Sequence, residues 1–547
     1  MASETIHKSS EPAVLTITPG AKKIFQSIYR AQNGAAVVID ENIALIQVSD
    51  VISKMAFYYE KIRNAVQYQE EHLLRKDAIE RILKRQIIIE NPIKFSKVDV
   101  RESARHLLIE LIRAGYLPNN SLPETKIDEV AAIIAKYLEL RRLMPNLEMG
   151  NLDFVIGLAS SEVEELIDPD TVSKTIMSVM YNLLEKRLEL PASLPYDQDL
   201  PIQLYLSIHR SFLKFDNDML SLILLRYFNG DWEHATKETV QRVAKNASSL
   251  RHLIDDQLNH VLAGRIDHIV SSYTVFFTIL KDVISEDPEA VYDEFFDDTK
   301  AFSRRIKKVC AKRYANSRTK LWRSAWRSII YIFLTKSIFA VLLEIPADKF
   351  FGSTVSSSSL AINITFPSLL LFFAVATARL PNDENTKRII SGLEEIVFNE
   401  KRKDDPIQIK KPIGRHPVMN VIFALIYAVT FFISFGAVVW LLDTIHFSWI
   451  STVIFLFFLT FVSFFIIRIR RNAKEWIVVE SRDTFSRFLL DFFATPIVAT
   501  GKWLTGKFSQ INVFVFVLDF IIEAPFKIFV DIAEEWTKYV RERKDSL

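Results

Sequence analysis

The sequence contains few of the residues on which disulfide-bonded and β-rich proteins depend. Its 547 residues include one cysteine, Cys310, so no disulfide can form within the chain. This cysteine usage fits a reducing compartment such as the cytoplasm. Only 13 glycines accompany 41 phenylalanines, a ratio that disfavours turn-rich β structure. We therefore expect an all-α fold.

The N-terminal region has no apolar stretch of the kind that forms the core of a signal peptide. The first thirty residues are polar and are interrupted by Pro12 and Pro19. We therefore expect no cleaved signal, and insertion into a membrane would depend on internal apolar segments. The sequence also lacks the HExxH and CxxC motifs of common metal sites, and we expect no cofactor.

A basic segment at residues 304–327 divides the chain. The net charge is only +2, yet ten basic residues and no acidic residue lie in this segment, and long uncharged runs follow it. Excess Lys and Arg marks the cytoplasmic side of membrane helices. We expect anionic lipid headgroups as the partner of this belt and prefer them to nucleic acid, because the belt directly precedes an apolar run. The headgroup-binding residues would be Arg304, Arg305, Lys307, Lys308, Lys312 and Arg313.

Four apolar segments predict a polytopic membrane domain at residues 328–468. The spans lie near residues 328–343, 360–378, 418–442 and 447–467. The third would be about 37 Å long as a helix, enough for a hydrocarbon core of about 30 Å. Basic residues in the flanking loops place both termini in the cytoplasm. The sequence thus predicts a multi-pass protein of the cytoplasmic membrane.

Polar residues within the spans are candidates for function. Lys336 lies near the middle of the first span, and an ionisable group there is a functional candidate. Glu344 is about 12 Å further along a helix, too far for a firm ion pair. We therefore favour a lysine that reaches the inner headgroups over a transport role or a buried structural pair. Asn363, with Thr365 and Pro367, could line a pore or form ordinary interhelical hydrogen bonds.

The C-terminal segment at residues 469–547 predicts amphipathic helices at the inner membrane interface. Its apolar runs contain Asp491 and Asp519, and charges at the centre of a bilayer are costly. A six-span arrangement, in which these carboxylates join Lys336, is the alternative. It also keeps the C terminus in the cytoplasm, so the charge rule does not decide between the two.

Residues 1–303 predict a large cytoplasmic helical domain. Apolar residues recur at helical spacing, and we expect one long helix at residues 51–89. Further helices are expected near residues 98–114, 127–143, 171–188, 202–228 with a break near Asp216, and 239–284. No repeat of fixed period indicates a solenoid.

Two motifs could carry chemistry. His252, Asp256 and His260 follow one another at i+4 spacing and could hold a divalent metal on one helix face, although a solvated helix flank is the preferred interpretation. The run GKWLTGKF at residues 501–508 matches part of a phosphate-binding loop. Phe508 replaces the required Ser or Thr, so we expect a loop between two interfacial helices instead.

Stretches such as FYYEKIRNAVQYQEEHLLRKDAIERILKR, LPIQLYLSIHRSFLK and SIIYIFLTKSIFAVLLEIP resemble uncharacterised multi-pass membrane proteins of small-genome, uncultivated bacteria. The resemblance implies a bacterial cytoplasmic membrane and carries over no catalytic or binding residue. From the sequence we expect a non-enzymatic scaffold or adaptor that presents its helical domain to a protein partner. The alternatives are a transporter or channel, oligomeric or with six spans, and a membrane-bound metal- or nucleotide-dependent enzyme.

Overall fold

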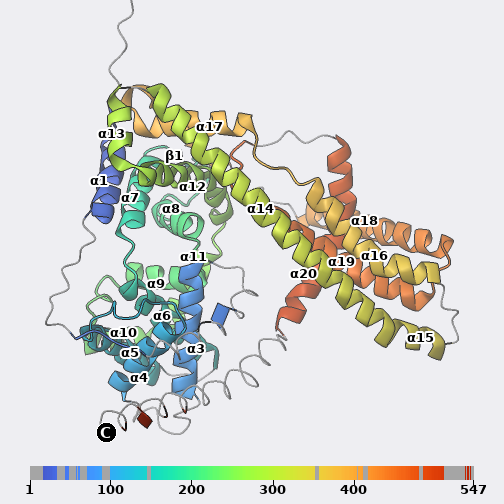
Figure 1. The fold of residues 1–547 in the computed structure, drawn as a ribbon, viewed down its shortest axis with the longest axis horizontal. Coiled ribbons are helices and arrows are strands. Elements are labelled where there is room, and N and C mark those ends of the chain that lie inside the picture. The colour runs from blue at the N-terminus through green and yellow to red at the C-terminus, as the bar shows by residue number, and fades with distance from the viewer. Residues whose placement is uncertain are drawn as a thin grey trace, which may run out of the picture. The chain divides into compact units, whose positions relative to one another are not determined.

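The computed structural model describes residues 16–33, 44–48, 57, 60–61, 70–88, 99–144, 149–297, 299–351, 357–402, 405–410, 417–479 and 485–510, and five single residues between 532 and 543. Helices make up almost all of this part of the chain (Figure 1). The two strands, β1 (Leu188–Glu189) and β2 (Ile407–Gln408), have two residues each and pair in parallel. The predicted all-α fold is confirmed.

The chain divides into two compact units. The helical unit comprises residues 18–277, 403–412 and 517–547, and the apolar unit comprises residues 1–17, 278–402 and 413–516. The helices of the helical unit, with α12 continuing into the apolar unit, are α1 (Pro19–Asn33), α3 (Glu71–Ile88), α4 (Val100–Arg113), α5 (Thr125–Leu143), α6 (Met149–Ile167), α7 (Thr171–Glu185), α8 (Leu200–Ile208), α9 (Asn217–Phe228), α10 (Lys237–Lys245), α11 (Ala247–Leu258) and α12 (Ala263–Glu286).

The helical unit has its own hydrophobic core, formed mainly by α3, α4, α5, α6, α9 and α10. Its largest buried side chain is Trp232, whose indole donates a hydrogen bond of 3.1 Å to Tyr137. Short polar side chains begin several helices. Asp216 accepts from the backbone N–H of Met219 and so caps α9, which satisfies a donor that the helix leaves free.

The apolar unit contains the long helix α14 and three further apolar helices (Figure 1). Its elements are α13 (Pro288–Asp297), α14 (Thr299–Phe339), a π-helical turn (Ala340–Glu344), α15 (Ile345–Phe350), α16 (Ser357–Ala376), α17 (Asp383–Val397), α18 (Pro417–Thr444), α19 (Trp449–Ala473) and α20 (Phe485–Gln510). Within this unit α16 packs against both α14 and α19.

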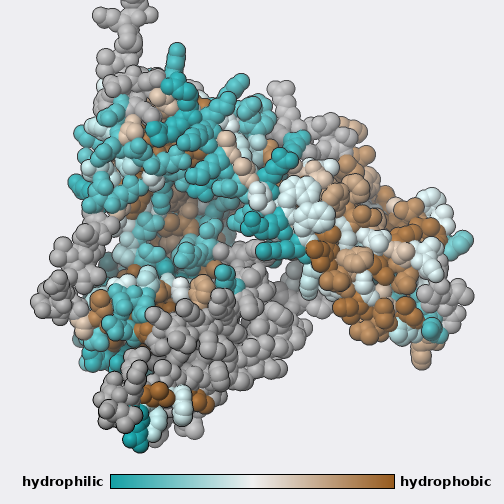
Figure 2. All heavy atoms as spheres, in the orientation of Figure 1, coloured by the Kyte–Doolittle hydropathy of each residue, from teal (hydrophilic) through white to brown (hydrophobic). Residues whose placement is uncertain are grey.

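Within the described part of the chain, four helices are long and apolar enough to cross a membrane: Lys300–Phe350, Ser357–Ala376, Val418–Thr444 and Trp449–Arg470. These confirm the four predicted segments. Their side chains leave a broad hydrophobic surface, which Figure 2 shows gathered over this part of the chain. The first apolar segment is longer than expected, because the basic belt and the apolar run form one continuous helix, α14.

α20 packs against both α18 and α19. Ser434 donates a hydrogen bond of 2.9 Å to the carbonyl of Phe493. A Cβ atom added at Gly501 would lie 2.0 Å from the carbonyl oxygen of Thr460, so the absence of a side chain allows α19 and α20 to approach closely. The prediction of a loop at residues 501–508 is wrong, because α20 continues through Gln510.

Other boundaries also differ from the sequence-based expectation. The helix expected at residues 51–89 begins at Glu71 within the described part of the chain. The helix expected at residues 239–284 is three helices, α10 to α12, because the chain turns at Asn246 and again after Leu258. The break expected near Asp216 is present. Helices α1, α6, α13 and α17 were not predicted.

Candidate functional site

One face of the α14–α15 segment is buried in the apolar unit, and its buried side chains change from apolar to ionisable along the segment. Leu321, Ala325 and Ile332 are buried first, and Lys336, Ala340, Glu344 and Asp348 follow. The spacing of about four residues keeps these side chains on one stripe. The stripe therefore begins apolar and ends with three ionisable residues in an interior position.

These three residues form a polar cluster with side chains of α16, of α19 and of the residue directly before α19. We define the Lys336–Glu344 cluster as Lys336, Glu344, Asp348, Asn363, Ser448 and Ser451. The hydroxyl of Ser451 donates to Glu344 Oε1 at 2.7 Å and lies 3.3 Å from Asp348 Oδ2. Ser448 donates to Asp348 Oδ1 at 2.7 Å, and the Asn363 amide donates to Glu344 Oε1. The cluster thus joins three helices through carboxylate oxygens.

The centre of the cluster contains polar atoms without hydrogen bonds. Lys336 Nζ lies 3.9 Å from Glu344 Oε2, and neither atom has a hydrogen-bond partner among the residues that the structure describes. Asn363 Oδ1 is also without one. Lys336 and Asn363 are 0% exposed and Glu344 is 1% exposed. Buried polar atoms are nearly always satisfied by protein or by bound solvent, so these three atoms mark a position with unused bonding capacity.

The geometry corrects two expectations about Lys336. The side chain does not extend to the end of the bundle but is fully buried, with Nζ 4.1 Å from the ring centroid of Phe458. Glu344 is also within ion-pair distance. The estimate of 12 Å considered only the rise along the helix. It ignored the length of the two side chains and the π-helical turn Ala340–Glu344, which alters the helical register here.

Helix irregularities occur at this level of the bundle. Pro346 follows the π-helical turn, and Pro367 lies one turn after Asn363 in α16. Because proline has no N–H, Pro367 cannot donate the usual helical hydrogen bond to the carbonyl of Asn363. Prolines are tolerated in membrane helices where neighbouring groups satisfy the freed carbonyl.

An apolar core occupies the remainder of the α14–α16–α19 interface. Its buried members are Leu321, Ala325, Ile332, Leu371, Val375, Val462, Ile466 and Ile469. The polar cluster lies beyond this core, toward the turn that precedes Trp449. The interface is therefore polar at one end and apolar at the other.

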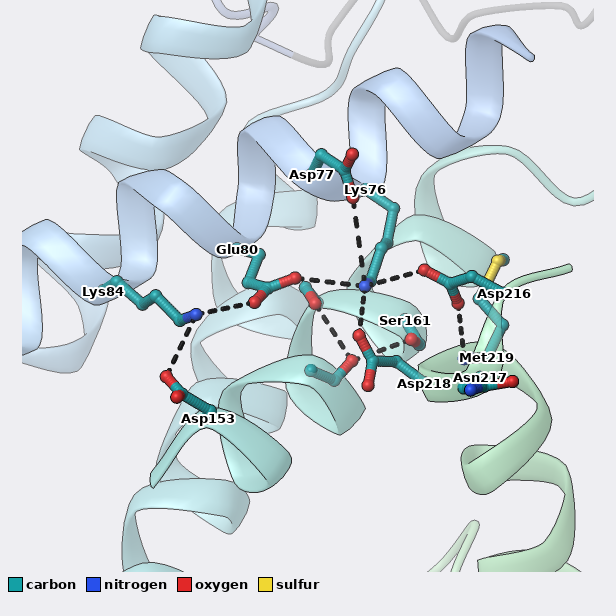
Figure 3. A network of polar contacts seen from close by, with 12 residues as sticks. Lys76, Asp77, Glu80, Lys84, Asp153, Ser161, Asp216, Asn217, Asp218 and Met219 are labelled. Atoms are coloured by element: carbon teal, nitrogen blue, oxygen red, sulfur yellow. Dashed lines mark hydrogen bonds and ion pairs between the residues drawn. The ribbon is translucent and has the colours of Figure 1, made fainter. Parts of the chain in front are cut away.

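A second ionic network occupies the helical unit (Figure 3). Lys76 is 1% exposed and its Nζ contacts Glu80 at 3.0 Å, Asp216 at 2.9 Å and also Asp218. Asp77 lies at the limit of ion-pair distance. These contacts link α3 to the first turn of α9. Lys76 neutralises part of the charge of the carboxylates around it, which indicates that this network stabilises the fold of the helical unit.

The electrostatics of this network follow from burial. Burial alone would lower the pKa of Lys76, but Glu80, Asp216 and Asp218 raise it above the ordinary value for lysine. Burial raises the pKa of Asp77 to about 6, against the opposing effect of Lys76. Burial likewise raises the pKa of Asp218. Lys76, even with Lys84 2.8 Å from Glu80, therefore does not fully compensate the four carboxylates around it.

The structure separates the three residues of the predicted metal site. α11 ends at Leu258, so His260 does not share a helix with His252 and Asp256. His260 instead lies 3.7 Å from Asp199 and packs edge-on against Tyr196. His252 and Asp256 are exposed. Among the described residues no group of three His, Cys, Asp or Glu side chains is placed to hold a metal ion.

The basic belt is part of α14, and several of its members have acidic partners. Arg313 forms an ion pair with Asp282 at 2.6 Å and stacks on Trp476. Lys312 lies 3.6 Å from Glu286. Lys307 and Lys308 are exposed. Arg304 and Arg305 lie on the same helix.

The remaining predicted residues lie apart from the cluster or outside the described chain. Asp491 is exposed on α20. Asp519 lies outside the described residues. The sequence suggested Lys336 and Asn363 separately, but not Glu344, Asp348 or the serines. One pattern in the sequence could have indicated the acidic members of the cluster. In the run LLEIPADK, Glu344 and Asp348 are four residues apart, which places them one helical turn apart.

The fold and the cluster define an all-α protein. Its described residues include four helices long and apolar enough to cross a membrane, with an ionisable cluster buried among three of them. Comparisons with protein-family models, with curated proteins and with solved structures find no match for the chain.

Proposed function

We propose that this chain is a multi-pass protein of a bacterial cytoplasmic membrane that acts as a scaffold or adaptor. In this proposal both termini and the helical unit lie in the cytoplasm, and the helical unit binds a soluble protein partner. The charge asymmetry of the sequence supports the orientation. The separate hydrophobic core of the helical unit supports a domain that presents surfaces of its own.

A patch of aromatic side chains on the helical unit carries the partner-binding proposal. Tyr205 and Tyr227 are 42% and 57% exposed. The Tyr181 ring lies 6.1 Å from the Tyr205 ring. Burial, a hydrogen bond to Glu185 and the nearby Tyr227 raise the pKa of Tyr181 to about 12, so its ring stays neutral. Clustered exposed tyrosines are typical of binding hot spots.

A photo-cross-linking amino acid at position 205 of the full-length chain tests this proposal. We expect one discrete adduct in intact cells, and we expect it to disappear when Tyr227 is changed to Asp. The same amino acid at Leu253, an exposed apolar residue of α11, is the matched control. No adduct at position 205, or the same adducts at both positions, would contradict the scaffold proposal.

A second candidate function is a transporter or channel, and the Lys336–Glu344 cluster favours it. Ionisable residues inside membrane helices generally mark ion or proton pathways. Four spans are few for a monomeric transporter, so this function requires a homo-oligomer or insertion of α20. Ion flux into vesicles containing the purified protein tests it. Unchanged flux in Lys336→Ala would count against it.

A further inference from the structure

We propose that the Lys336–Glu344 cluster is a binding site for one monovalent metal cation, held by carboxylate, hydroxyl and amide oxygens. The inference deepens the second candidate function and rests on the membrane location of the apolar helices, but not on transport itself. A cation could be bound without being moved across the membrane.

The first argument is charge balance. Glu344 and Asp348 are two carboxylates, and Lys336 is the only cation that contacts either of them in the described part of the chain. With all three ionised, the cluster keeps one negative charge at a place where Asp348 is 3% exposed and Glu344 is 1% exposed. A buried charge is costly unless a counter-charge accompanies it. One monovalent cation restores neutrality, whereas a divalent cation would reverse the imbalance.

The second argument is the set of atoms without hydrogen bonds. Glu344 Oε2 and Asn363 Oδ1 are acceptors, both fully buried and without donors. Ser451 Oγ, between Glu344 and Asp348, has lone pairs in addition to the proton that it donates. Hard cations prefer oxygen ligands of these kinds. Two of the three atoms without hydrogen bonds are thus acceptors, the third being Lys336 Nζ, and the two oxygens could coordinate a cation.

The third argument is the position of Lys336. Its ammonium group lies 3.9 Å from Glu344 Oε2, has no hydrogen bond to the described residues, and lies 4.1 Å from the ring centroid of Phe458. The lysine therefore balances the charge of one carboxylate without using Glu344 Oε2 as a hydrogen-bond acceptor.

A proton on one carboxyl group would supply the same positive charge, so the experiment must separate the two sources. The full-length protein is purified into lipid nanodiscs, and its melting temperature is measured in NaCl, LiCl, KCl and choline chloride at constant ionic strength. Binding of 22Na⁺ at equilibrium is measured in parallel. Both measurements are repeated at pH 5.5 and pH 8.

We expect the melting temperature to rise with a metal chloride and not with choline, to saturate, and to do so more clearly at pH 8. Bound 22Na⁺ should approach one per chain. Asp348→Asn should weaken binding by about tenfold or more, because it removes a charged ligand. Ser451→Ala provides a milder second variant. Asp443→Asn, which changes an exposed carboxylate at the end of α18, should bind like the unaltered protein.

Equal melting temperatures in all four salts, with no bound 22Na⁺, would overturn the inference. A melting temperature that responds to pH but not to any metal cation would overturn it as well and would assign the charge to a proton. Binding without flux in vesicles would leave the cation site established and the transport function refuted. Flux without saturable binding would support the transport function and overturn the cation site.

Discussion

Replacing Lys336 by methionine should destabilise the protein strongly, although methionine has a similar shape and is apolar. Lys336 is fully buried and its ammonium lies 3.9 Å from Glu344 Oε2. At an effective dielectric constant near 20, this attraction is worth about 4 kcal/mol. Removing one partner of a buried pair usually costs about 3–5 kcal/mol, because the remaining charge stays buried. We expect Lys336→Met to lower the free energy of unfolding by about this amount.

A double-mutant cycle isolates the interaction. Glu344→Gln alone should also destabilise, but Lys336→Met combined with Glu344→Gln should recover about 2 kcal/mol or more relative to the sum of the single changes. Unfolding is followed by tryptophan fluorescence in mixed micelles with increasing SDS. Lys349→Met is the matched control, because Lys349 is exposed on α15 and its replacement should change stability by at most about 0.5 kcal/mol. The Lys336–Glu344 pairing would be refuted if the effects of Lys336→Met and Glu344→Gln on the free energy of unfolding were additive. It would also be refuted if Lys336→Met and Lys349→Met lowered that free energy equally.

Three further predictions follow from packing, buried hydrogen bonds and pKa. Gly501→Val should destabilise by about 1–3 kcal/mol in the same assay, because its Cβ would meet the Thr460 carbonyl, and a stability equal to that of the unaltered protein would show that the helices do not approach closely. Asn385→Leu should cost about 2 kcal/mol or more, because it leaves the buried Trp476 carbonyl without its 2.7 Å hydrogen bond; no change in melting temperature would contradict this. The raised pKa of Asp77, about 6 in the folded chain, favours the protonated form, so its stabilising contribution is complete below about pH 4 and is lost as pH rises through 6. Asp77→Asn should therefore raise the melting temperature at pH 7.5 and have little effect at pH 4, and the reverse pH dependence would show that the raised pKa is wrong.

The apolar helices could be predicted from the sequence because their signal is local. Residues 418–442 and 447–467 carry no charge, and the structure has helices α18 and α19 there. The first span was harder to delimit. The basic N-terminal part of this span differs in composition from the apolar part and therefore looks like a separate segment. A helix can continue across such a change, and α14 includes both parts.

The cluster was only partly predictable, because it depends on tertiary packing. Lys336 and Asn363 were conspicuous as polar residues in apolar runs. Ser448 and Ser451 were not, because serine near a helix start is ordinary capping chemistry. Their role follows only from the packing of α19 beside α14 and α16. Likewise, the close approach at Gly501 depends on α19, and no local pattern around the glycine could reveal it.

Cysteine accessibility mapping tests the central claim, a multi-pass membrane protein with its helical unit in the cytoplasm, most directly. Cys310 is replaced by Ser, and single cysteines are placed at Ser317, Ser356, Thr444, Ser509 and Ser546 and exposed on intact cells to an impermeant thiol reagent. We predict labelling at positions 356 and 444 and none at 317, 509 or 546. Labelling at position 509 would mean that the chain crosses the membrane again after α19. Labelling at 317, or its absence at 444, would contradict the account.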